Sequence, residues 1–549
     1  MPESAVRGRP ASPDRSATPH LRDYGDLMTT ASARVAVAAP NDLSASAGTR
    51  LAAEGGNAID AALAAVLVTM VSEPGLVSLA SGGYLTIQPP DGSAPVTIDG
   101  WVDMPGRGLP AERFGRAVWD VRTPYGGDTT MTVGHGSVAT PGTLKAVERA
   151  HQRFGRVPWA QVLAPAIAAA RDGFPLNQAS HAYLEYVHLE IFGWQPESYA
   201  VLHDADGTLV PRGSTVRIPD LAASLQQIAV EGSDAFYTGD IAKLMADDLE
   251  AHGGILTLDD LAAYEVAERP ALTVRQGGWQ LATNPGPAMG GVCMSALLAM
   301  CDGRPARGSW SPDELAHLVR SQHAVFGIGI NRHDDEDARL GLARELLNRS
   351  LGSASTAHVS AVDDDGGACA VTVSAGYGSG VLSPGTGIWL NNCLGEQELV
   401  LNGVHALQPG TRLNSNMAPT VGRRERDGAA LAIGSPGSDR IVTAVAQVLS
   451  LHLNGGLDLA AAIAHPRVHV RVRDGQDPPV RIDHEADLRL PAGLSDELGL
   501  PTRSMDTHAM YFGGVGAAQW EPGGGLTAAG DPRRTGSVAV TGSNQAHST

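Results

Sequence analysis

The sequence has few of the features that mark disulfide-rich or nucleic-acid-binding proteins. Only 4 of its 549 residues are cysteine, and none of them stand in a CxxC spacing. This usage indicates neither a zinc site nor a disulfide framework, so we expect reduced, mostly buried thiols, as in a cytosolic protein. Basic residues are outnumbered, with 40 Lys and Arg against 59 Asp and Glu. The resulting net charge of −19 argues against a nucleic-acid partner and favours a small-molecule substrate.

Long apolar runs are absent as well. The longest run, residues 61–71, is too short to cross a bilayer, so we expect a core helix there and no membrane association. Residues 1–34 are rich in Pro, Ser, Arg and Ala but contain no continuous apolar stretch. This composition predicts a disordered tail rather than a secretory signal, and therefore a cytoplasmic protein.

The first third of the chain carries clear helix and strand signals. Asn41 can cap a helix that runs through residue 54, and Asn57 with Asp60 has the capping-box pattern that opens a second helix over residues 58–71. The patterns at residues 84–88 and 96–99 predict core strands. Residues 140–176 contain two amphipathic helices separated by a Gly/Pro segment at 155–158. These patterns predict paired helices packed against strands.

A threonine stands directly before a predicted β-hairpin. Residues 358–362 alternate polar and apolar side chains, residues 363–367 (DDDGG) supply turn chemistry, and residues 368–373 form a second apolar run. If the bond between Ser355 and Thr356 is cut, the freed amine of Thr356 can accept the proton of its own hydroxyl. That hydroxyl then becomes a nucleophile without a distant histidine. Spacing alone leaves a plain strand-edge hydroxyl as the alternative.

The sequence TAHVSAVD, which begins at Thr356, resembles the T-[TAS]-H-x-S-V-x-D motif that opens the small subunit of γ-glutamyltransferases, a family of N-terminal-nucleophile hydrolases. Other family-like blocks, such as LAAEGGNAIDAALAA at 51–65, extend the resemblance from about residue 35 to residue 539. It implies an α+β fold, a four-layer αββα sandwich made from two subunits that the chain produces by cutting itself. The expected parts are the tail (1–34), a large subunit (35–355) and a small subunit (356–549). The two subunits should stay associated, and the pair is open to further dimerisation.

The resemblance also assigns chemistry to particular residues. It implies that Thr356 attacks an acyl carbon, that Ser374 steers the nucleophile, and that the backbone N–H groups of Gly437 and Ser438 hold the oxyanion. Water then releases the acyl-enzyme, and neither a cofactor nor a metal is expected. Strand-end hydrogen bonding for Ser374 and a simple Gly/Pro turn at 437–438 are the plainer structural interpretations.

The implied substrate pocket departs from the family pattern. Trp101 stands where the family has an Arg that clamps the α-carboxylate of a γ-glutamyl group, and an indole cannot replace that clamp. Glu396 stands where the family has an Asp that binds the substrate ammonium group. Of the family's pair of serines, Ser415 keeps one hydroxyl and Asn416 replaces the other. The loop after Ser374 is shorter than in the family and lacks an Asn that contacts the substrate. We therefore expect a pocket changed from ordinary γ-glutamyl donors, with Arg107 as a candidate for the missing guanidinium.

The sequence thus predicts a self-processing threonine hydrolase whose donor is a γ-glutamyl amide, another amide or a ketone. The ketone option rests on relatives from the 4-alkylproline pathways of lincomycin and pyrrolobenzodiazepine antibiotics, which are associated with hydrolytic C–C cleavage. An alternative of another class is an unprocessed binding protein without activity. The intact TAHVSAVD motif argues against it.

Three groups of histidines outside this motif do not show the spacing of a metal site. Acidic residues surround His333 in segment 331–337, but consecutive carboxylates lack ligand periodicity, so a solvated loop is expected. His465 and His469 are four residues apart, yet the alternation in VHVRV predicts a strand rather than a shared helix face. His181 and His188 are expected to be packing or surface residues on a helix.

Overall fold

The structure is a computed structural model that describes residues 33–123, 129–327, 356–396, 403–472, 478–542 and 547–548. Residues 1–32 of the predicted tail, the acidic segment around His333, and Ser355 lie outside these ranges. In the part of the chain that is described, no helix is both long and apolar enough to span a membrane. All four cysteines are free and buried, as expected.

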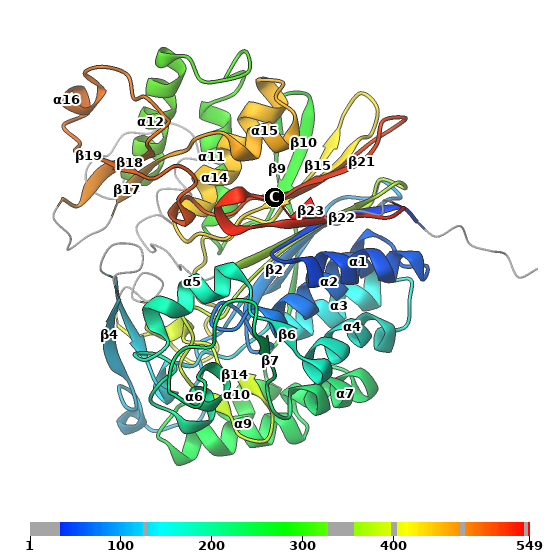
Figure 1. Cartoon of the computed structure of the whole chain (residues 1–549), viewed down its shortest axis with the longest axis vertical. Helices are drawn as coiled ribbons and strands as arrows, with labels where there is room; N and C mark the ends of the chain where they lie inside the picture. Colours follow the sequence, from blue (N-terminus) through cyan, green and yellow to red (C-terminus); the bar gives the residue numbers. More distant parts are fainter. Residues whose placement is uncertain are drawn as a thin grey trace, which may run out of the picture. The chain divides into compact units, whose positions relative to one another are not determined.

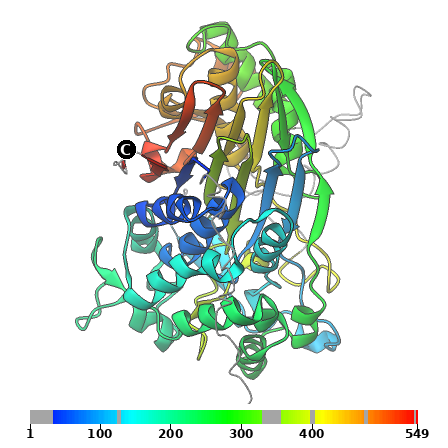
Figure 2. The ribbon, with the colours of Figure 1, turned by 90° about the vertical axis from the view of Figure 1, so that its right-hand side faces the viewer.

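Two antiparallel sheets form the centre of the molecule (Figures 1 and 2). The first has the order β23-β22-β1-β11-β12-β2-β3-β8, and the second has the order β21-β20-β16-β15-β10-β9. The strands of the first sheet are β1 (Val35–Ala39), β2 (Gly82–Gln88), β3 (Val96–Gly100), β8 (Ala267–Pro270), β11 (Ala357–Asp363), β12 (Ala368–Ser374), β22 (Ser537–Val540) and β23 (His547–Ser548). Those of the second are β9 (Leu272–Gln276), β10 (Trp279–Thr283), β15 (Thr420–Arg424), β16 (Ala430–Gly434), β20 (Gly516–Glu521) and β21 (Gly525–Ala529).

The two sheets pack face to face, with β11 and β12 against β16 and β20. The apolar cluster between them consists mainly of alanines, including Ala36, Ala370, Ala432 and Ala518, all fully buried. Small side chains let the two backbones approach closely, so the sheets form a double layer with little room for large groups.

Helices cover both outer faces (Figure 1). On the first sheet lie α1 (Asp42–Ala53), α2 (Ala58–Ser72) and α3 (Thr143–Phe154), with α4 (Trp159–Asp172) packed on α2 and α7 (Leu221–Glu231) packed on α4. On the second lie α11 (Gly290–Met300) and α14 (Arg440–Leu449), with α12 (Pro312–Gly327) packed on α11. The predicted four-layer αββα sandwich is confirmed.

The remaining elements extend the helical layers and the connections. The helices are α5 (Gln178–Val187), α6 (Pro196–Leu202), α8 (Asp234–Tyr237), α9 (Asp240–Ala251), α10 (Leu258–Ala262), α15 (Leu459–Ala464) and α16 (Leu494–Leu498). Short 3-10 and π segments are η1 (Ala111–Arg113), η2 (His135–Ser137), η3 (Cys393–Gly395), η4 (Ser450–Asn454), η5 (Met510–Phe512) and η6 (Pro532–Arg534). The outer strands are β4 (Trp119–Thr123), β5 (Thr129–Val133), β6 (Phe174–Pro175), β7 (Thr215–Val216), β13 (Leu382–Ser383), β14 (Ile388–Trp389), β17 (Val468–Val472), β18 (Val480–Glu485) and β19 (Thr502–Met505).

The local sequence signals explain where the first helices begin. The Asn41 side chain accepts a hydrogen bond from the Ser44 N–H and caps α1, and Asn57 with Asp60 forms the predicted capping box of α2. The predicted pair at 140–176 is present as α3 and α4, and the predicted hairpin is present as β11 and β12. One boundary differs, because Ser374 is the last residue of β12 rather than the residue after it.

Candidate active site

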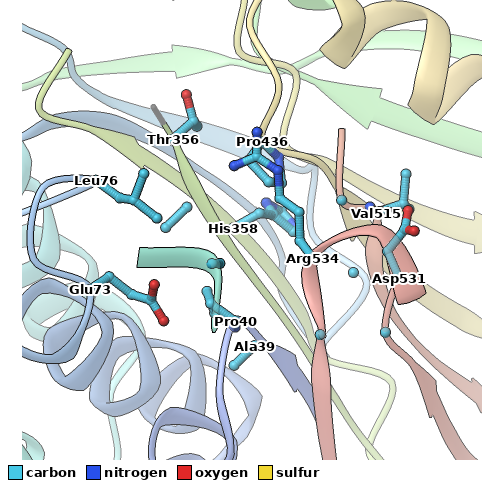
Figure 3. Close-up of a pocket in the computed structure, with 16 residues that line it drawn as sticks. Ala39, Pro40, Glu73, Leu76, Thr356, His358, Pro436, Val515, Asp531 and Arg534 are labelled. Atoms are coloured by element: carbon cyan, nitrogen blue, oxygen red, sulfur yellow. Dashed lines mark hydrogen bonds between the residues drawn. The ribbon is translucent and has the colours of Figure 1, made fainter. Parts of the chain in front are cut away.

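Thr356 lies at the start of β11, beside a small cavity (Figure 3). The residue is 2% exposed, and its Oγ1 has no hydrogen-bond partner among the described residues. The cavity measures about 30 Å³, which is room for about one water molecule rather than for an acyl substrate. Buried hydroxyls are normally hydrogen-bonded, so an unpaired one at a cavity marks a candidate reactive group.

His358 cannot serve as the base for Thr356. Its Nδ1 lies 2.8 Å from Thr372 Oγ1, and its Nε2 lies 2.8 Å from Ser360 Oγ. Because the Ser360 hydroxyl donates to the Gly516 carbonyl, Nε2 carries the proton and Nδ1 accepts from Thr372. Burial lowers the pKa of His358 to about 3, so the ring is neutral at physiological pH. Both ring nitrogens are used to hold β11 in place.

Asp363, at the other end of β11, also has a structural task. Its carboxylate accepts hydrogen bonds from the N–H groups of Ala58, at 2.9 Å, and Gly367, at 2.7 Å. It therefore ties the start of α2 to the hairpin turn. Within the described motif, the hydroxyl of Thr356 is the one reactive group that lacks a partner.

A row of residues crosses the four central strands β11, β12, β2 and β3 at the end where Thr356 lies. The strand register pairs Ala357 with Val373, Val373 with Gly83, and Gly83 with Gly100. One residue further along, the row reads Thr356, Ser374, Gly82 and Trp101, of which Ser374 and Gly82 pair directly. Neighbouring strands are about 4.8 Å apart, so the Cα atoms of Thr356 and Trp101 are separated by about 14 Å. Ser374 lies between them, next to Thr356, and its Oγ accepts a hydrogen bond from the Gly376 N–H at 3.0 Å.

Trp101 forms a fixed apolar wall at the far end of this row. Its side chain is fully buried and stacks on Tyr84, with ring centroids 6.1 Å apart and planes inclined by 19°. A Cβ atom at Gly82 would lie 2.7 Å from Trp101 Cε3, so the indole leans over Gly82. Its Nε1–H donates to the Asn414 carbonyl at 2.8 Å. The N–H is thus already used within the protein.

The arginines near Trp101 are paired with carboxylates. Arg107 Nε lies 3.7 Å from Asp260 Oδ1, rather than turning towards Trp101. Arg412 donates to Asp99 at 2.7 Å, and its Nε lies 2.6 Å from an oxygen of Asp103. Neither guanidinium takes the place of the clamp that the family pattern has at Trp101.

Glu396 lies beside the loop that follows Ser374. Glu396 is fully buried, and a Cβ atom at Gly376 would lie 3.0 Å from its Oε1. Burial, together with the nearby Glu396 carboxylate, raises the pKa of the Cys393 thiol well above its usual value, so the thiol stays protonated.

The segment that follows Asn414 anchors a helix. The Ser415 carbonyl accepts from Met289 N at 2.7 Å, and its Oγ accepts from Met417 N at 3.2 Å. Gly290 packs directly on the Asn416 carbonyl. Ser415 and Asn416 therefore join Trp101, through Asn414, to the start of α11.

The segment between β16 and α14 holds two unpaired backbone donors. Gly437 has φ +127° and Ser438 has φ +63°, a left-handed conformation that is strained for a residue with a Cβ. Among the described residues, no hydrogen bond uses the N–H of either residue. The preceding Pro436 borders the cavity of Thr356, and α14 begins at Arg440, so its N-terminal dipole favours negative charge here.

Three charged residues at the cavity, Glu73, Asp531 and Arg534, were not predicted from the sequence. Glu73 and Arg534 border the space beside Thr356 from opposite sides (Figure 3). Glu73 accepts hydrogen bonds from Asn41 and Asn177 at 2.5 Å and from Ser180 at 2.9 Å, and burial raises its pKa. Its position before Pro74 had indicated only a helix end.

A buried threonine that heads a central strand of an αββα double sheet defines the class of N-terminal-nucleophile hydrolases. The model of the gamma-glutamyltranspeptidase family matches residues 44–353 and 344–541, so this chain belongs to that family and is an enzyme of it. Family membership supports hydrolysis of amide bonds as the general activity, and the alternative of a binding protein without activity is not supported.

Individual relatives agree with this assignment. The chain is 28% identical over 529 residues to the glutathione hydrolase proenzyme of Escherichia coli K12, covering 87% of each chain. It is 28% identical over 563 residues to the acylase ACY 1 proenzyme of Pseudomonas sp. SE83, covering 95% of this chain and 97% of the relative. The crystal structure of cephalosporin acylase from Bacillus halodurans has the same fold, with a TM-score of 0.75 at 24% identity over 92% of this chain and 96% of that one.

Proposed function

We propose that this enzyme cuts its own chain before Thr356 and then uses the new N-terminal residue to hydrolyse an amide. The Thr356 hydroxyl attacks the acyl carbon while the freed α-amine takes the hydroxyl proton and passes it to the leaving nitrogen. Water then attacks the acyl-enzyme, gives its proton to the same amine, and releases the acid and the free hydroxyl. The products of the processing step would be a fragment of residues 1–355, which contains the tail (1–34) and the large subunit (35–355), and the small subunit, with residues 356–549.

The observation that carries this proposal is the buried, unpaired hydroxyl of Thr356 at the cavity bordered by Pro436. The N–H groups of Gly437 and Ser438, directly after Pro436, are the donors expected to hold the oxyanion. Fixed donors of this kind contribute about 2.7–4 kcal/mol each to acyl transfer. Ser374, next to Thr356 in the strand row, orients the nucleophile in this proposal. The name proenzyme, given to both relatives, supports self-processing.

For the substrate, we propose an acyl group with a flat or apolar end that faces Trp101. The indole N–H is bonded to Asn414, and the nearby arginines Arg107 and Arg412 are paired with carboxylates. Among the described residues, neither of these arginines would be a partner for a substrate carboxylate at this wall. Glu396 is the residue proposed to recognise a cationic group, and Ser415 and Asn416 would complete the pocket. The acylase relative supports acyl groups other than γ-glutamyl.

A ketone donor, and with it hydrolytic C–C cleavage in the biosynthesis of a 4-alkylproline antibiotic, is the second candidate. The same nucleophile and oxyanion donors would serve a ketone carbon, and the apolar wall of Trp101 suits a pyrroline ring. A panel of γ-glutamyl amides, other acyl amides and acyl-pyrroline or diketone compounds separates the two candidates.

The processing step is tested by electrophoresis and N-terminal sequencing. Purified wild-type protein should give two fragments, of which the smaller begins Thr-Ala-His-Val, and Thr356→Ala should give one. An active wild-type enzyme that runs as a single full-length chain would rule out the mechanism.

A further inference from the structure

Three side chains with metal-binding atoms meet away from the cavity of Thr356. His135 begins η2, which follows β5, Asp248 lies in the last turn of α9, and His252 caps that helix. One potential ligand atom from each lies within 4.8 Å of the others. None of the three borders the cavity of Thr356, so this cluster is separate from the proposed reaction.

Two polar atoms of the cluster are buried without a partner. His135 is 8% exposed, and its Nε2 has no hydrogen-bond partner among the described residues. The same holds for Oδ2 of Asp248. Buried nitrogen and carboxylate oxygen atoms are nearly always paired, so two unpaired ones in a single cluster indicate a ligand that they share.

The side chains are held in position by their surroundings. The His135 ring stacks on the His252 ring, with centroids 4.5 Å apart, and its edge meets Trp194 at 5.3 Å. Asp248 and His252 are four residues apart at the end of a helix, so they share one face. Oδ1 of Asp248 lies 3.2 Å from Nδ1 of His252.

We propose that His135, Asp248 and His252 bind a divalent transition-metal ion of the zinc class, with water completing the coordination. Two imidazoles and one carboxylate suit Zn²⁺, whereas Mg²⁺ and Ca²⁺ prefer oxygen ligands alone. A tetrahedral zinc ion separates its ligand atoms by about 3.3 Å, so the cluster has to close slightly. The His252 ring stacks on His135 and its Nδ1 lies 2.8 Å from the Asp248 carbonyl oxygen, so closing the site would require this side chain, which is 55% exposed, to turn.

The proposed ion would have a structural role. It would join η2 to the end of α9, and η2 follows β5 directly. The Thr132 carbonyl of β5 accepts a hydrogen bond from Asn392 Nδ2 at 3.1 Å, in the segment that leads to Glu396. An occupied site would thus stabilise β5, which contacts the segment that leads to Glu396 in the proposed substrate pocket.

Two other pairs that contain histidine provide matched controls. His181 and Glu185 are also four residues apart on a helix, with the nearest atoms 3.8 Å apart. His188 Nδ1 lies 2.7 Å from His203 Nε2. Among the described residues, neither pair belongs to a group of three potential ligands as close as the proposed one.

The test is titration of the full chain with Co²⁺ and Zn²⁺ after removal of metal by a chelator. We expect one equivalent of Co²⁺ to bind with a visible absorption band, and Zn²⁺ to displace it. His252→Ala and His135→Ala should each weaken binding tenfold or more, whereas His181→Ala and His188→Ala should bind as the wild type does.

His252 is exposed, so His252→Ala should fold normally, which an unchanged melting temperature in the absence of metal verifies. Absence of saturable Co²⁺ binding by the wild type would overturn the proposal. So would equal affinity in a folded His252→Ala variant, or loss of binding in His188→Ala, which would place the ion on the His188–His203 pair.

Discussion

The two ends of the row from Thr356 to Trp101 differ in how far they keep the family pattern. At the Thr356 end, the hydroxyl and the backbone donors of Gly437 and Ser438 have no partner among the described residues and lie at or next to one cavity. At the Trp101 end, the indole is stacked, buried and hydrogen-bonded within the protein. In the proposed mechanism, the chemistry of acyl transfer and the choice of acyl group would depend on separate parts of the sheet edge, so one could change while the other is kept.

The largest effect is expected from removing the nucleophile. Thr356→Ala should abolish both processing and turnover, with turnover lowered by a factor of about 10⁴ or more, because no acyl-enzyme forms. Thr356→Ser keeps a hydroxyl and is the matched control, which should still process. Fragment analysis and hydrolysis rates measure both effects. Substantial turnover by Thr356→Ala would mean that the reactive group at this end of the row lies elsewhere.

Changing the wall should alter substrate binding without stopping self-processing. Trp101→Ala removes a fully buried ring, so we expect a loss of about 3–5 kcal/mol of stability and a higher KM for apolar acyl amides. Trp101→Phe keeps an apolar face but loses the bond to Asn414 and part of the buried ring volume, so it should lower stability by less than Trp101→Ala does, by about 1–3 kcal/mol. Denaturant unfolding and KM measurements on both variants distinguish the contribution of the apolar ring face from that of the indole N–H. Equal KM values for both variants and the wild type would refute the assigned wall.

A change of pH should alter the stability of the fold through the protonation of His358. Its pKa falls from about 6.5 in the unfolded chain to about 3 in the fold, so the unfolded state binds the extra proton. The stability contributed by the neutral ring is complete above pH 6.5 and is lost as pH falls towards 3. Between pH 6.5 and 5 the wild type should lose about 2 kcal/mol more than His358→Gln does. The same pH dependence of unfolding in the two proteins would show that His358 is not a neutral, buried side chain.

The smallest effect is expected at Ser438. A left-handed backbone at a residue with a Cβ costs about 1–2 kcal/mol, part of which the greater chain entropy of glycine offsets. Ser438→Gly should therefore gain about 0.5 kcal/mol in stability and keep its activity, because the N–H donor stays. Ser438→Ala retains the strain and should show no gain. Thermal unfolding compared with hydrolysis rates checks this, and a large loss of activity in Ser438→Gly would indicate a role for the Ser438 hydroxyl.

Local signals allowed much of this fold to be predicted from the sequence. The caps at Asn41 and Asn57 and the turn after Asp363 act within a few residues, so their helices and hairpin are visible in the sequence alone. The layer arrangement followed from the family resemblance.

Long-range partners are what the sequence could not show. Nothing near Trp101 indicates that its N–H is used by Asn414 or that Arg107 pairs with Asp260. In the same way, His135 is distant in sequence from Asp248 and His252, so their meeting depends on tertiary packing. The roles assigned to Thr356, Ser374, Gly437 and Ser438 remain predictions that the variants above address.

The measurement that tests the separation of the two ends most directly is kcat/KM of the processed wild-type enzyme on two anilides, one γ-glutamyl and one with an apolar acyl group. Loss of a bidentate charged contact corresponds to about 2–5 kcal/mol, so the apolar substrate should be preferred by a factor of about 30 or more. Trp101→Ala should reduce that preference. Efficient turnover of the γ-glutamyl anilide that Trp101→Ala leaves unchanged would contradict the account.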